Sequence, residues 1–183
     1  MKIISGKLKG RNIDGYNIEG TRPTMDRVKE SIFASIQNYI NNAIVLDLFS
    51  GSGNLGFEAI SNGSKLCYFN DHNYKCIKSI QDNINKFNIK DQSITLNLDY
   101  MKCLNYLKDH NIKLDLIFLD PPYKLNIIDE IIEFIINNDL LNNNGLIICE
   151  MTSILTKEYN DLKLIKEKNY SEKNVYIYKK IEL

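Results

Sequence analysis

The sequence of 183 residues has no long apolar run, no paired cysteines and few histidines or arginines. No apolar stretch approaches the roughly 20 residues that a membrane-spanning helix requires. The first residues lack the apolar core and cleavage site of a secretory signal. The four cysteines form no Cys-x-x-Cys pair and the two histidines have no clustered partners, so a metal site is not expected. These absences predict a cytoplasmic protein with one domain and no membrane contact.

Arginine is confined to one end of the chain. The formal net charge of +0 gives no reason by itself to expect a nucleic-acid partner. Residues 1–11, however, contain four basic side chains and no acid, and the three arginines are Arg11, Arg22 and Arg27. A planar guanidinium binds phosphate in a bidentate manner that lysine cannot reproduce. A basic end on a neutral protein favours a polyanion bound to one face, with structural salt bridges as the alternative.

From residue 43 onward, short β-rich apolar runs alternate with helical patterns. This alternation predicts βαβ units and a doubly wound, mostly parallel sheet. The expected strands are 43–48, 65–70, 93–97, 114–119 and 146–150, and the expected helices are 54–62, 74–87, 100–108 and 127–137. Gly145, after the polar residues 142–144, is expected to form the turn into the last of these strands.

The two ends of the chain differ from this pattern. Residues 162–168 and 174–181, joined by 169–173, predict an antiparallel hairpin at one side of the sheet. At the other end, 3–5 and 11–13 flank 6–10 and predict a small β-hairpin. A helix is expected over 25–39, with Thr24 as its N-cap. We therefore expect residues 1–40 to form an extension to a catalytic core of residues 41–183.

A glycine turn (residues 47–56) follows the first strand of the core. Asp47 ends that strand, Gly51 and Gly53 permit backbone angles and a close approach that a Cβ would block, and a helix follows. The open amides of that helix can meet an anion. Asp71, after the second strand, can accept the ribose hydroxyls of NAD or of S-adenosylmethionine equally well. Asp99 can accept from an adenine amine or cap the following helix.

The segment Asp120-Pro121-Pro122-Tyr123 follows an apolar strand and is called the clamp here. A carboxylate at the carboxyl end of a parallel strand lies where ligands bind. Two prolines remove two donors, so the backbone presents only carbonyl acceptors. Asp120 and the Pro121 carbonyl can then accept both hydrogens of an exocyclic amine and orient its nitrogen lone pair. Tyr123 can stack on an extruded base. Together with the glycine turn, the clamp indicates methyl transfer from S-adenosylmethionine to nitrogen.

Thr21-Arg22-Pro23-Thr24-Met25-Asp26-Arg27-Val28, the opening Ile3-Ile4-Ser5-Gly6-Lys7-Leu8-Lys9-Gly10-Arg11, the glycine turn and the clamp resemble the RsmD family of bacterial 16S rRNA guanine-N2 methyltransferases. The resemblance covers nearly the whole chain, and the Thr-Arg-Pro-Thr segment is its most specific part. It implies a class I methyltransferase fold with a seven-stranded, Rossmann-like sheet. It also implies S-adenosylmethionine as cofactor and the 2-amino group of a guanine in the 30S subunit as target.

The resemblance also implies a role for each matching residue. Asp47, Ser50, Gly51 and Gly53 would surround the methionine end of the cofactor, Asp71 the ribose and Asp99 the adenine. Arg22, Thr24 and Arg27 would line the entrance for cofactor and substrate, and Lys7, Lys9 and Arg11 would contact rRNA phosphates. The family usually has alanine where this chain has Ser50. Ribosomal proteins would supply part of the docking surface, and the enzyme is expected to be a monomer.

Three alternatives compete with this interpretation. An amino-methyltransferase could act on DNA or on a protein glutamine, but 183 residues leave no room for a separate DNA-recognition domain, and a glutamine clamp more often begins with asparagine. A nicotinamide-dependent oxidoreductase would use the glycine turn but leaves the clamp unexplained. An inactive rRNA-binding assembly factor would need a defect in the site, and the sequence shows none.

Overall fold

The computed structural model describes residues 1–15, 23–122, 127–152, 157–171 and 173–182, with the backbone alone for 23–25. The elements are α1 (Pro23–Ile40), β1 (Ile44–Asp47), α2 (Asn54–Ser61), β2 (Leu66–Asn70), α3 (Tyr74–Phe87), η1 (Lys90–Gln92), β3 (Ser93–Leu96), α4 (Tyr100–Asp109), β4 (Leu114–Leu119), α5 (Ile128–Asn137), β5 (Leu141–Met151), β6 (Leu162–Asn169) and β7 (Asn174–Lys180).

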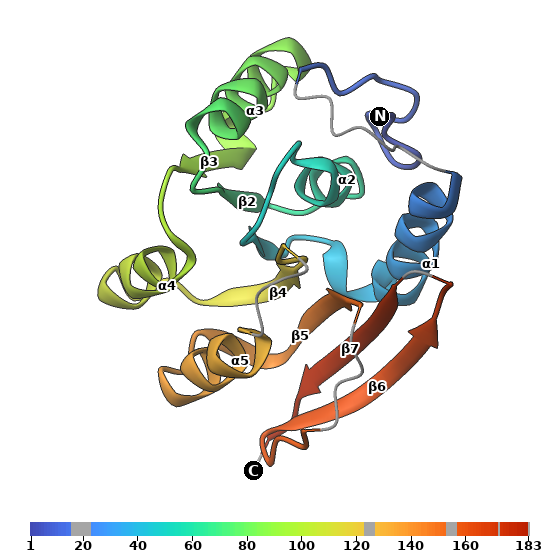
Figure 1. The fold of residues 1–183 in the computed structure, drawn as a ribbon. Coiled ribbons are helices and arrows are strands. Elements are labelled where there is room, and N and C mark those ends of the chain that lie inside the picture. The colour runs from blue at the N-terminus through green and yellow to red at the C-terminus, as the bar shows by residue number, and fades with distance from the viewer. Residues whose placement is uncertain (16–22, 123–126, 153–156, 172, 183) are drawn as a thin grey trace.

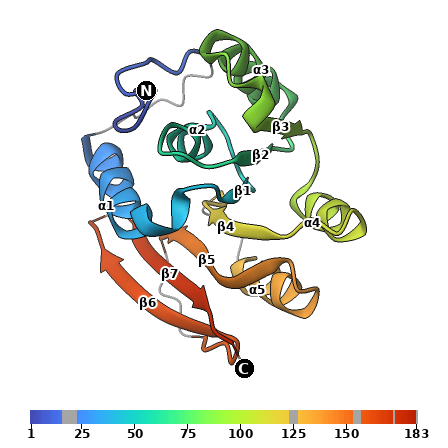
Figure 2. The same ribbon diagram turned by 180° about the vertical axis from the view of Figure 1, so that it is seen from behind.

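The described strands form one seven-stranded sheet in the order β3-β2-β1-β4-β5-β7-β6. Strands β1 to β5 are parallel, and β7 is antiparallel to both β5 and β6. The predicted parallel sheet with a C-terminal antiparallel hairpin is confirmed (Figures 1 and 2). No helix in the described ranges has the length and apolar character needed to cross a membrane.

Helices cover the sheet on both faces. Alternate residues of each strand point to opposite faces, so Leu116 and Phe118 of β4 pack with α1, α2 and α3, whereas Ile117 and Leu119 pack with α4 and α5. Figure 1 shows this arrangement, with α1 to α3 on one side of the sheet and α4 and α5 on the other. The ring of Phe33 lies 5.7 Å from that of Phe118 and joins α1 to the centre of the sheet.

Two predicted boundaries were wrong. Helix α1 begins at Pro23, so Thr24 lies inside the first turn and is not the N-cap. Proline suits the first helical position because its fixed φ is helical and its missing N–H would have no partner there. Strand β5 begins at Leu141, not at 146, because Leu141 pairs with Leu114 before an irregularity leads to the pairing of Leu146 with Leu116. Asn144 has a φ of 63° within this irregular part.

Residues 1–15 form an arm that folds back on itself, as predicted, but only partly as a β-hairpin. Ile3 N–H donates to the Arg11 carbonyl at 3.0 Å and Ile13 N–H to the Met1 carbonyl at 2.9 Å. The described part of the arm contains one isolated antiparallel bridge, between Lys2 and Asn12, so 3–5 and 11–13 are not regular strands.

A buried ion pair fastens this arm to the core. Lys29 of α1 and Glu58 of α2 are 2% and 0% exposed, and their charged atoms lie 3.1 Å apart. Glu58 also accepts from the backbone N–H groups of Ile4 and Ser5 and from the Ser5 hydroxyl. Lys29 donates to the Lys2 carbonyl and to Asn54 Oδ1, both at 2.8 Å. The pair therefore joins the arm, α1 and the start of α2.

We expect Lys29→Met to lower the free energy of unfolding by about 3–5 kcal/mol, because it leaves the Glu58 carboxylate buried without its cation. Urea unfolding at neutral pH measures this change. Lys78→Met is the matched control, since Lys78 is an exposed lysine paired with Asp82 on the surface of α3. Equal stability of the two variants would contradict the anchoring role of Lys29.

Candidate active site

The register of the parallel strands gathers acidic side chains at one edge of the sheet. This edge, where β1 to β5 end, is called the carboxyl edge here. Asp47 of β1 pairs with Phe69 of β2 and with Phe118 of β4. Asp71 and Asp120 each follow the paired residue by two positions, so they lie on either side of Asp47. Leu119 pairs with Cys149, which places Glu150 beside Asp120.

The glycine turn leads from β1 into α2 at this edge. Gly51 and Gly53 have φ values of 52° and 79°, in the left-handed region that glycine adopts without strain. Gly51 N–H donates to Asp71 Oδ2 at 2.9 Å, and Gly53 N–H donates to the Ser50 carbonyl at 2.7 Å. The Ser50 hydroxyl donates back to the Asp47 carbonyl at 2.8 Å. The backbone angles predicted for this turn are confirmed.

Two glycines of this turn also lie where a side chain would collide with the protein interior. A Cβ on Gly53 would lie 2.7 Å from the Phe57 ring, and a Cβ on Gly56 would lie 2.3 Å from the Phe69 ring. Both contacts are inside the protein. The packing of α2 against the sheet therefore requires glycine at both positions. At Gly53 the positive φ requires it as well.

Asp47 is buried and acts on the helix that follows the turn. Gly53 occupies the N-cap position of α2 and has no side chain to cap it. Asp47 Oδ2 accepts instead from Gly56 N–H at 3.1 Å. Burial raises the pKa of Asp47 from its ordinary 3.8 to about 8; the Gly56 hydrogen bond opposes this shift, and the negative charges of Asp120, Asp71 and Glu150 add to it. Four carboxyl groups, those of Asp47, Asp71, Asp120 and Glu150, are therefore concentrated at the carboxyl edge.

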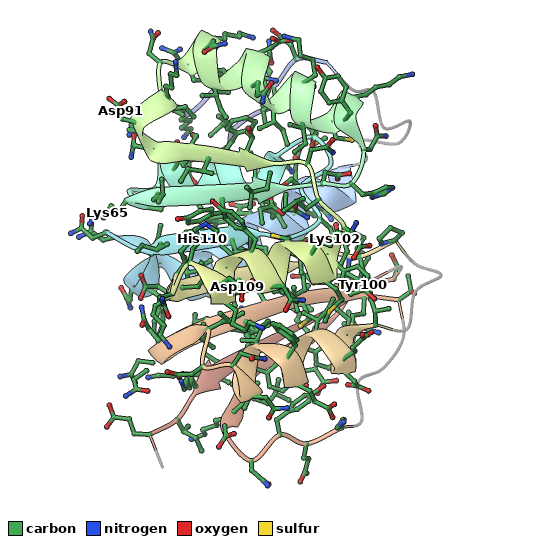
Figure 3. All side chains as sticks on the ribbon, turned by 90° about the vertical axis from the view of Figure 1, so that its left-hand side faces the viewer. Lys65, Asp91, Tyr100, Lys102, Asp109 and His110 are labelled. Carbon is green, nitrogen blue, oxygen red and sulfur yellow. The ribbon has the colours of Figure 1, made fainter. Side chains whose placement is uncertain are left out.

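Asp71 and Asp99 lie in the loops after β2 and β3. Asp71 accepts from Gly51 N–H and, at 2.8 Å, from Asn73 N–H, so it holds the glycine turn in place. Asp99 is exposed and caps α4 through Met101 N–H at 3.0 Å. The ring of Tyr100, the next residue, lies 5.9 Å from Phe49 of the glycine turn. Figure 3 shows Tyr100 and Lys102 at the end of α4 opposite to Asp109 and His110.

Asn70 joins the loops of this edge and was not predicted from the sequence. Its side-chain amide donates to the carbonyls of Leu48 and Leu98, both at 3.1 Å. Its Oδ1 is buried and has no hydrogen-bond partner among the described residues.

The clamp begins with Asp120, which has a lysine beside it. Lys173 Nζ lies 3.3 and 3.4 Å from the two oxygens of Asp120 and 3.1 Å from Glu150 Oε2. Burial raises the pKa of Asp120, and Lys173 opposes that shift. Burial and the charge of Asp120 raise the pKa of Glu150 to about 7. Pro121 is buried and Pro122 exposed.

Glu150 and Lys173 were absent from the residues proposed from the sequence. Glu150 comes directly after the apolar run 146–149, as Asp47 and Asp120 come directly after apolar runs, so its position was a usable signal. Lys173 had no such signal, because it reaches Asp120 only through the pairing of β5 with β7.

The predicted RNA-contact residues lie at two places. Lys7 N–H donates to the carbonyl of Ser61 at the end of α2, and Lys7 Nζ donates to Gln92 before β3. Arg11 lies over the ring of Phe87 at the end of α3. Lys7, Lys9 and Arg11 are exposed near the opposite edge of the sheet from Asp120. Arg27 is exposed near the start of α1, at the carboxyl edge. Arg27 lies near the start of α2 and Lys7 near its end. Because α2 has eight residues, these two places are about 12 Å or more apart.

Some predicted site residues cannot be placed. Arg22 and Tyr123 lie outside the described residues, as does the side chain of Thr24. Two hollows that described residues line lie away from the acidic edge. One, of about 510 Å³, is near Ile136 and Lys180, and the other, of about 360 Å³, is between the arm and α3 near Asp14 and Ser79. Asp47, Asp71 and Asp120 line neither hollow, so the chemistry of the side chains identifies the candidate site, and not the shape of a cavity.

We expect the stability of the protein to fall as pH rises from about 4 to 8, in part because folding must either keep Asp47 protonated or bury its charge. Asp47→Asn removes this contribution while its side-chain oxygen can still accept from Gly56. The difference in unfolding free energy between pH 5 and pH 8 should shrink by on the order of 2 kcal/mol or more in the variant. Urea unfolding at both pH values measures it. An unchanged difference, as expected for the exposed control Asp91→Asn, would contradict the raised pKa.

Comparison with known proteins agrees with the fold and the motifs. The family model described as conserved hypothetical protein 95 matches residues 1–179. The chain is 35% identical over 182 residues to YlbH of Bacillus subtilis, which is named as a candidate rRNA methyltransferase. The match covers 98% of this chain and 99% of YlbH. It is also 35% identical over 152 residues to ribosomal RNA small subunit methyltransferase D of Haemophilus influenzae. That match covers 82% of this chain and 78% of the relative.

Among solved structures, the candidate methyltransferase yhhF of Escherichia coli superposes with a TM-score of 0.88 at 25% identity, with 100% of this chain and 99% of that chain covered. The sheet order and this likeness identify the fold as that of the class I S-adenosylmethionine-dependent methyltransferases. The chain therefore belongs to the family described as conserved hypothetical protein 95, which is the RsmD family that its motifs resemble.

Proposed function

We propose that this protein transfers a methyl group from S-adenosylmethionine to the exocyclic N2 amine of a guanine in 16S rRNA, within the 30S subunit. The observation that carries the proposal is the position of Asp120. This carboxylate opens the clamp directly beside the glycine turn, within a cluster that also contains Asp47, Asp71 and Glu150.

The charge of the carboxyl edge suits this cofactor. S-adenosylmethionine carries its methyl group on a cationic sulfonium, which activates it for transfer, and it also carries an ammonium group. Burial chiefly raises the pKa of Asp47, neighbouring carboxylates raise it further, and a nearby cation relieves the repulsion among them. The pyrophosphate of a nicotinamide cofactor would instead be repelled. The acidic cluster therefore favours the methyl donor over the oxidoreductase alternative that the glycine turn left open.

The residues around the turn can bind the rest of the cofactor. Asp71 accepts one backbone N–H at each carboxylate oxygen, and each oxygen has a further lone pair for a ribose hydroxyl. The first amides of α2 have no carbonyl partners within the helix and can meet the carboxylate of the methionine moiety. Ser50, Gly51 and Gly53 shape the turn around it. Asp99 would receive the adenine amine through the oxygen that does not cap α4.

The clamp residues would hold the base. Asp120 Oδ and the Pro121 carbonyl would accept the two hydrogens of the amine, and Pro121 and Pro122 have no N–H to compete. Such acceptors orient the nitrogen lone pair away from conjugation with the ring and toward the methyl group. Asp120 would also take up the proton released after transfer. In this proposal Tyr123 stacks on the guanine, and Arg22 and Thr24 border the entrance.

The relatives and the surface charge support rRNA as the substrate. Several relatives are named ribosomal RNA small subunit methyltransferase D. Arg27 lies at the carboxyl edge, where phosphates next to the target guanine would pass. Lys7, Lys9 and Arg11 lie farther away and would contact a more distant part of the same rRNA. An RNA that contacts both groups of basic residues must be folded and wide enough to reach from one to the other, as the RNA of the small subunit is. Ribosomal protein would complete the docking surface, and the reaction would take place in the cytoplasm.

Label transfer tests the proposal directly. The purified protein is incubated with methyl-labelled S-adenosylmethionine and with small subunits that lack base methylation, beside naked 16S rRNA, duplex DNA and a glutamine-containing peptide. We expect one N2-methylguanine in the small-subunit RNA. Label in the DNA or the peptide would establish one of the alternative amino-methyltransferases. Cofactor binding without label in any sample would favour an inactive assembly factor.

We expect Asp120→Ala to reduce methyl transfer by about 100-fold or more, because the amine loses its charged acceptor in the transition state. The affinity for S-adenosylmethionine should stay near that of the wild type. Single-turnover transfer and calorimetric binding measure the two quantities. Asp91→Ala, an exposed acid near the start of β3 at the opposite edge (Figure 3), is the control and should leave both unchanged. Near-normal turnover in Asp120→Ala would remove the clamp from the mechanism.

We expect Asp71→Ala to weaken S-adenosylmethionine binding by about 1–3 kcal/mol, since the cofactor loses a charged acceptor and Gly51 loses its hydrogen bond. Calorimetric titration gives the dissociation constant. Asp82→Ala on the exposed face of α3 serves as the control. An unchanged dissociation constant in Asp71→Ala would place the ribose elsewhere.

A further inference from the structure

Lys173 occupies a central position in the candidate site. Its ammonium group lies 3.3 and 3.4 Å from the two oxygens of Asp120 and 3.1 Å from Glu150 Oε2. The Lys173 and Glu150 side chains are 13% and 9% exposed, and that of Asp120 is 32% exposed. The cation therefore sits on the inner side of Asp120, while part of the carboxylate faces the solvent from which a substrate would arrive.

The C-terminal hairpin delivers Lys173 to this place. Strand β7 runs antiparallel to β5, with Glu150 opposite Val175 and Met151 opposite Asn174. Lys173 comes immediately before β7, so it lies at the carboxyl edge where β5 ends. The hydrogen bond from Tyr170 N–H to the Lys173 carbonyl, at 2.7 Å, closes the turn between β6 and β7. The hairpin thus contributes to the site as well as extending the sheet.

The electrostatic need for this cation follows from its neighbours. Among the described groups, the charges that face Asp120 are Asp47 from β1, Glu150 from β5 and Lys173 from the hairpin turn. Burial raises the pKa of Asp120, Lys173 opposes that rise, and the other two neighbours are acidic. A protonated Asp120 would present an O–H donor in place of one acceptor oxygen. It could then no longer receive an amine hydrogen as a carboxylate does.

We propose that Lys173 is a positioning residue for methyl transfer, which holds Asp120 ionised and correctly oriented toward the amine, and that Glu150 anchors Lys173 in that position. The inference rests on the proposed function, in which Asp120 receives the target amine. The ammonium spans both oxygens of Asp120 at long, nearly equal distances, so lone pairs on the outer side of the carboxylate stay available to the substrate.

A purely structural salt bridge would have other consequences. It would fasten the hairpin to β4 and β5, and its loss would lower stability without moving the pH dependence of methyl transfer. Lys173→Met removes the charge, and Lys173→Arg keeps it at a slightly different geometry. Lys163→Met is the matched control, because Lys163 lies exposed in β6, at the opposite end of the same hairpin.

Direct titration of Asp120 tests whether Lys173 holds it ionised, and this test requires no activity. Protein carrying ¹³C-labelled aspartate is titrated by NMR, and the Asp120 carboxyl signal is assigned from its disappearance in Asp120→Asn. We expect the titration midpoint of Asp120 to rise by about one pH unit or more in Lys173→Met and to stay near the wild-type value in Lys173→Arg and Lys163→Met. A midpoint unchanged in Lys173→Met overturns the inference.

The pH profile of transfer to small subunits provides the second readout. In Lys173→Met the acid limb of the profile should move to higher pH by the same interval, with the dissociation constant of S-adenosylmethionine unchanged. Lys173→Arg should restore the wild-type limb. A wild-type enzyme that transfers label, together with an unshifted Lys173→Met profile, overturns the inference alone. A wild type that transfers no label overturns the proposed function, and the NMR titration still decides whether Lys173 controls Asp120.

Discussion

The parallel pairing of β1 with both β2 and β4 is the constraint on which the candidate site depends. Because Asp47 pairs with Phe69 on one side and Phe118 on the other, Asp71 and Asp120 end up beside it. The strand order reverses at β1, with β2 and β3 on one side and β4 and β5 on the other, and ligands of open α/β sheets bind at such a point. A shift of one residue in either pairing would turn these carboxylates away from one another. The chemistry therefore follows from the strand register.

Gathering carboxylates in this way has an electrostatic cost, and the structure offsets it locally. Asp47 receives Gly56 N–H, Asp71 receives Gly51 and Asn73 N–H, and Asp120 and Glu150 share Lys173. Burial, together with the remaining repulsion, raises the pKa values of Asp47 and Glu150. A cationic cofactor would reduce this repulsion further. The same acidic groups that raise the electrostatic cost of folding thus favour binding of a sulfonium.

Much of this arrangement could be predicted from the sequence, because it depends on local patterns. Asp47, Asp71 and Asp120 come at the ends of apolar runs, and the glycines between β1 and α2 predict the turn. Contacts distant in sequence were not predictable in this way. Lys29 and Glu58 each look like ordinary helix-surface charges, yet they form a buried pair. Lys173 resembles an ordinary turn residue in the sequence, and only the pairing of β7 with β5 brings it to Asp120. The start of α1 was missed because Thr24 is a good cap by type, whereas Pro23 already occupies the first helical position.

A structure of the protein with S-adenosylhomocysteine would test the central claim, that the acidic carboxyl edge is a methyl-donor site. We expect the amino-acid end of the ligand over residues 50–53, the ribose hydroxyls on Asp71, and the sulfur facing the Asp120 carboxylate. A ligand bound in another part of the molecule, or bound here with its sulfur turned away from Asp120, would contradict that claim.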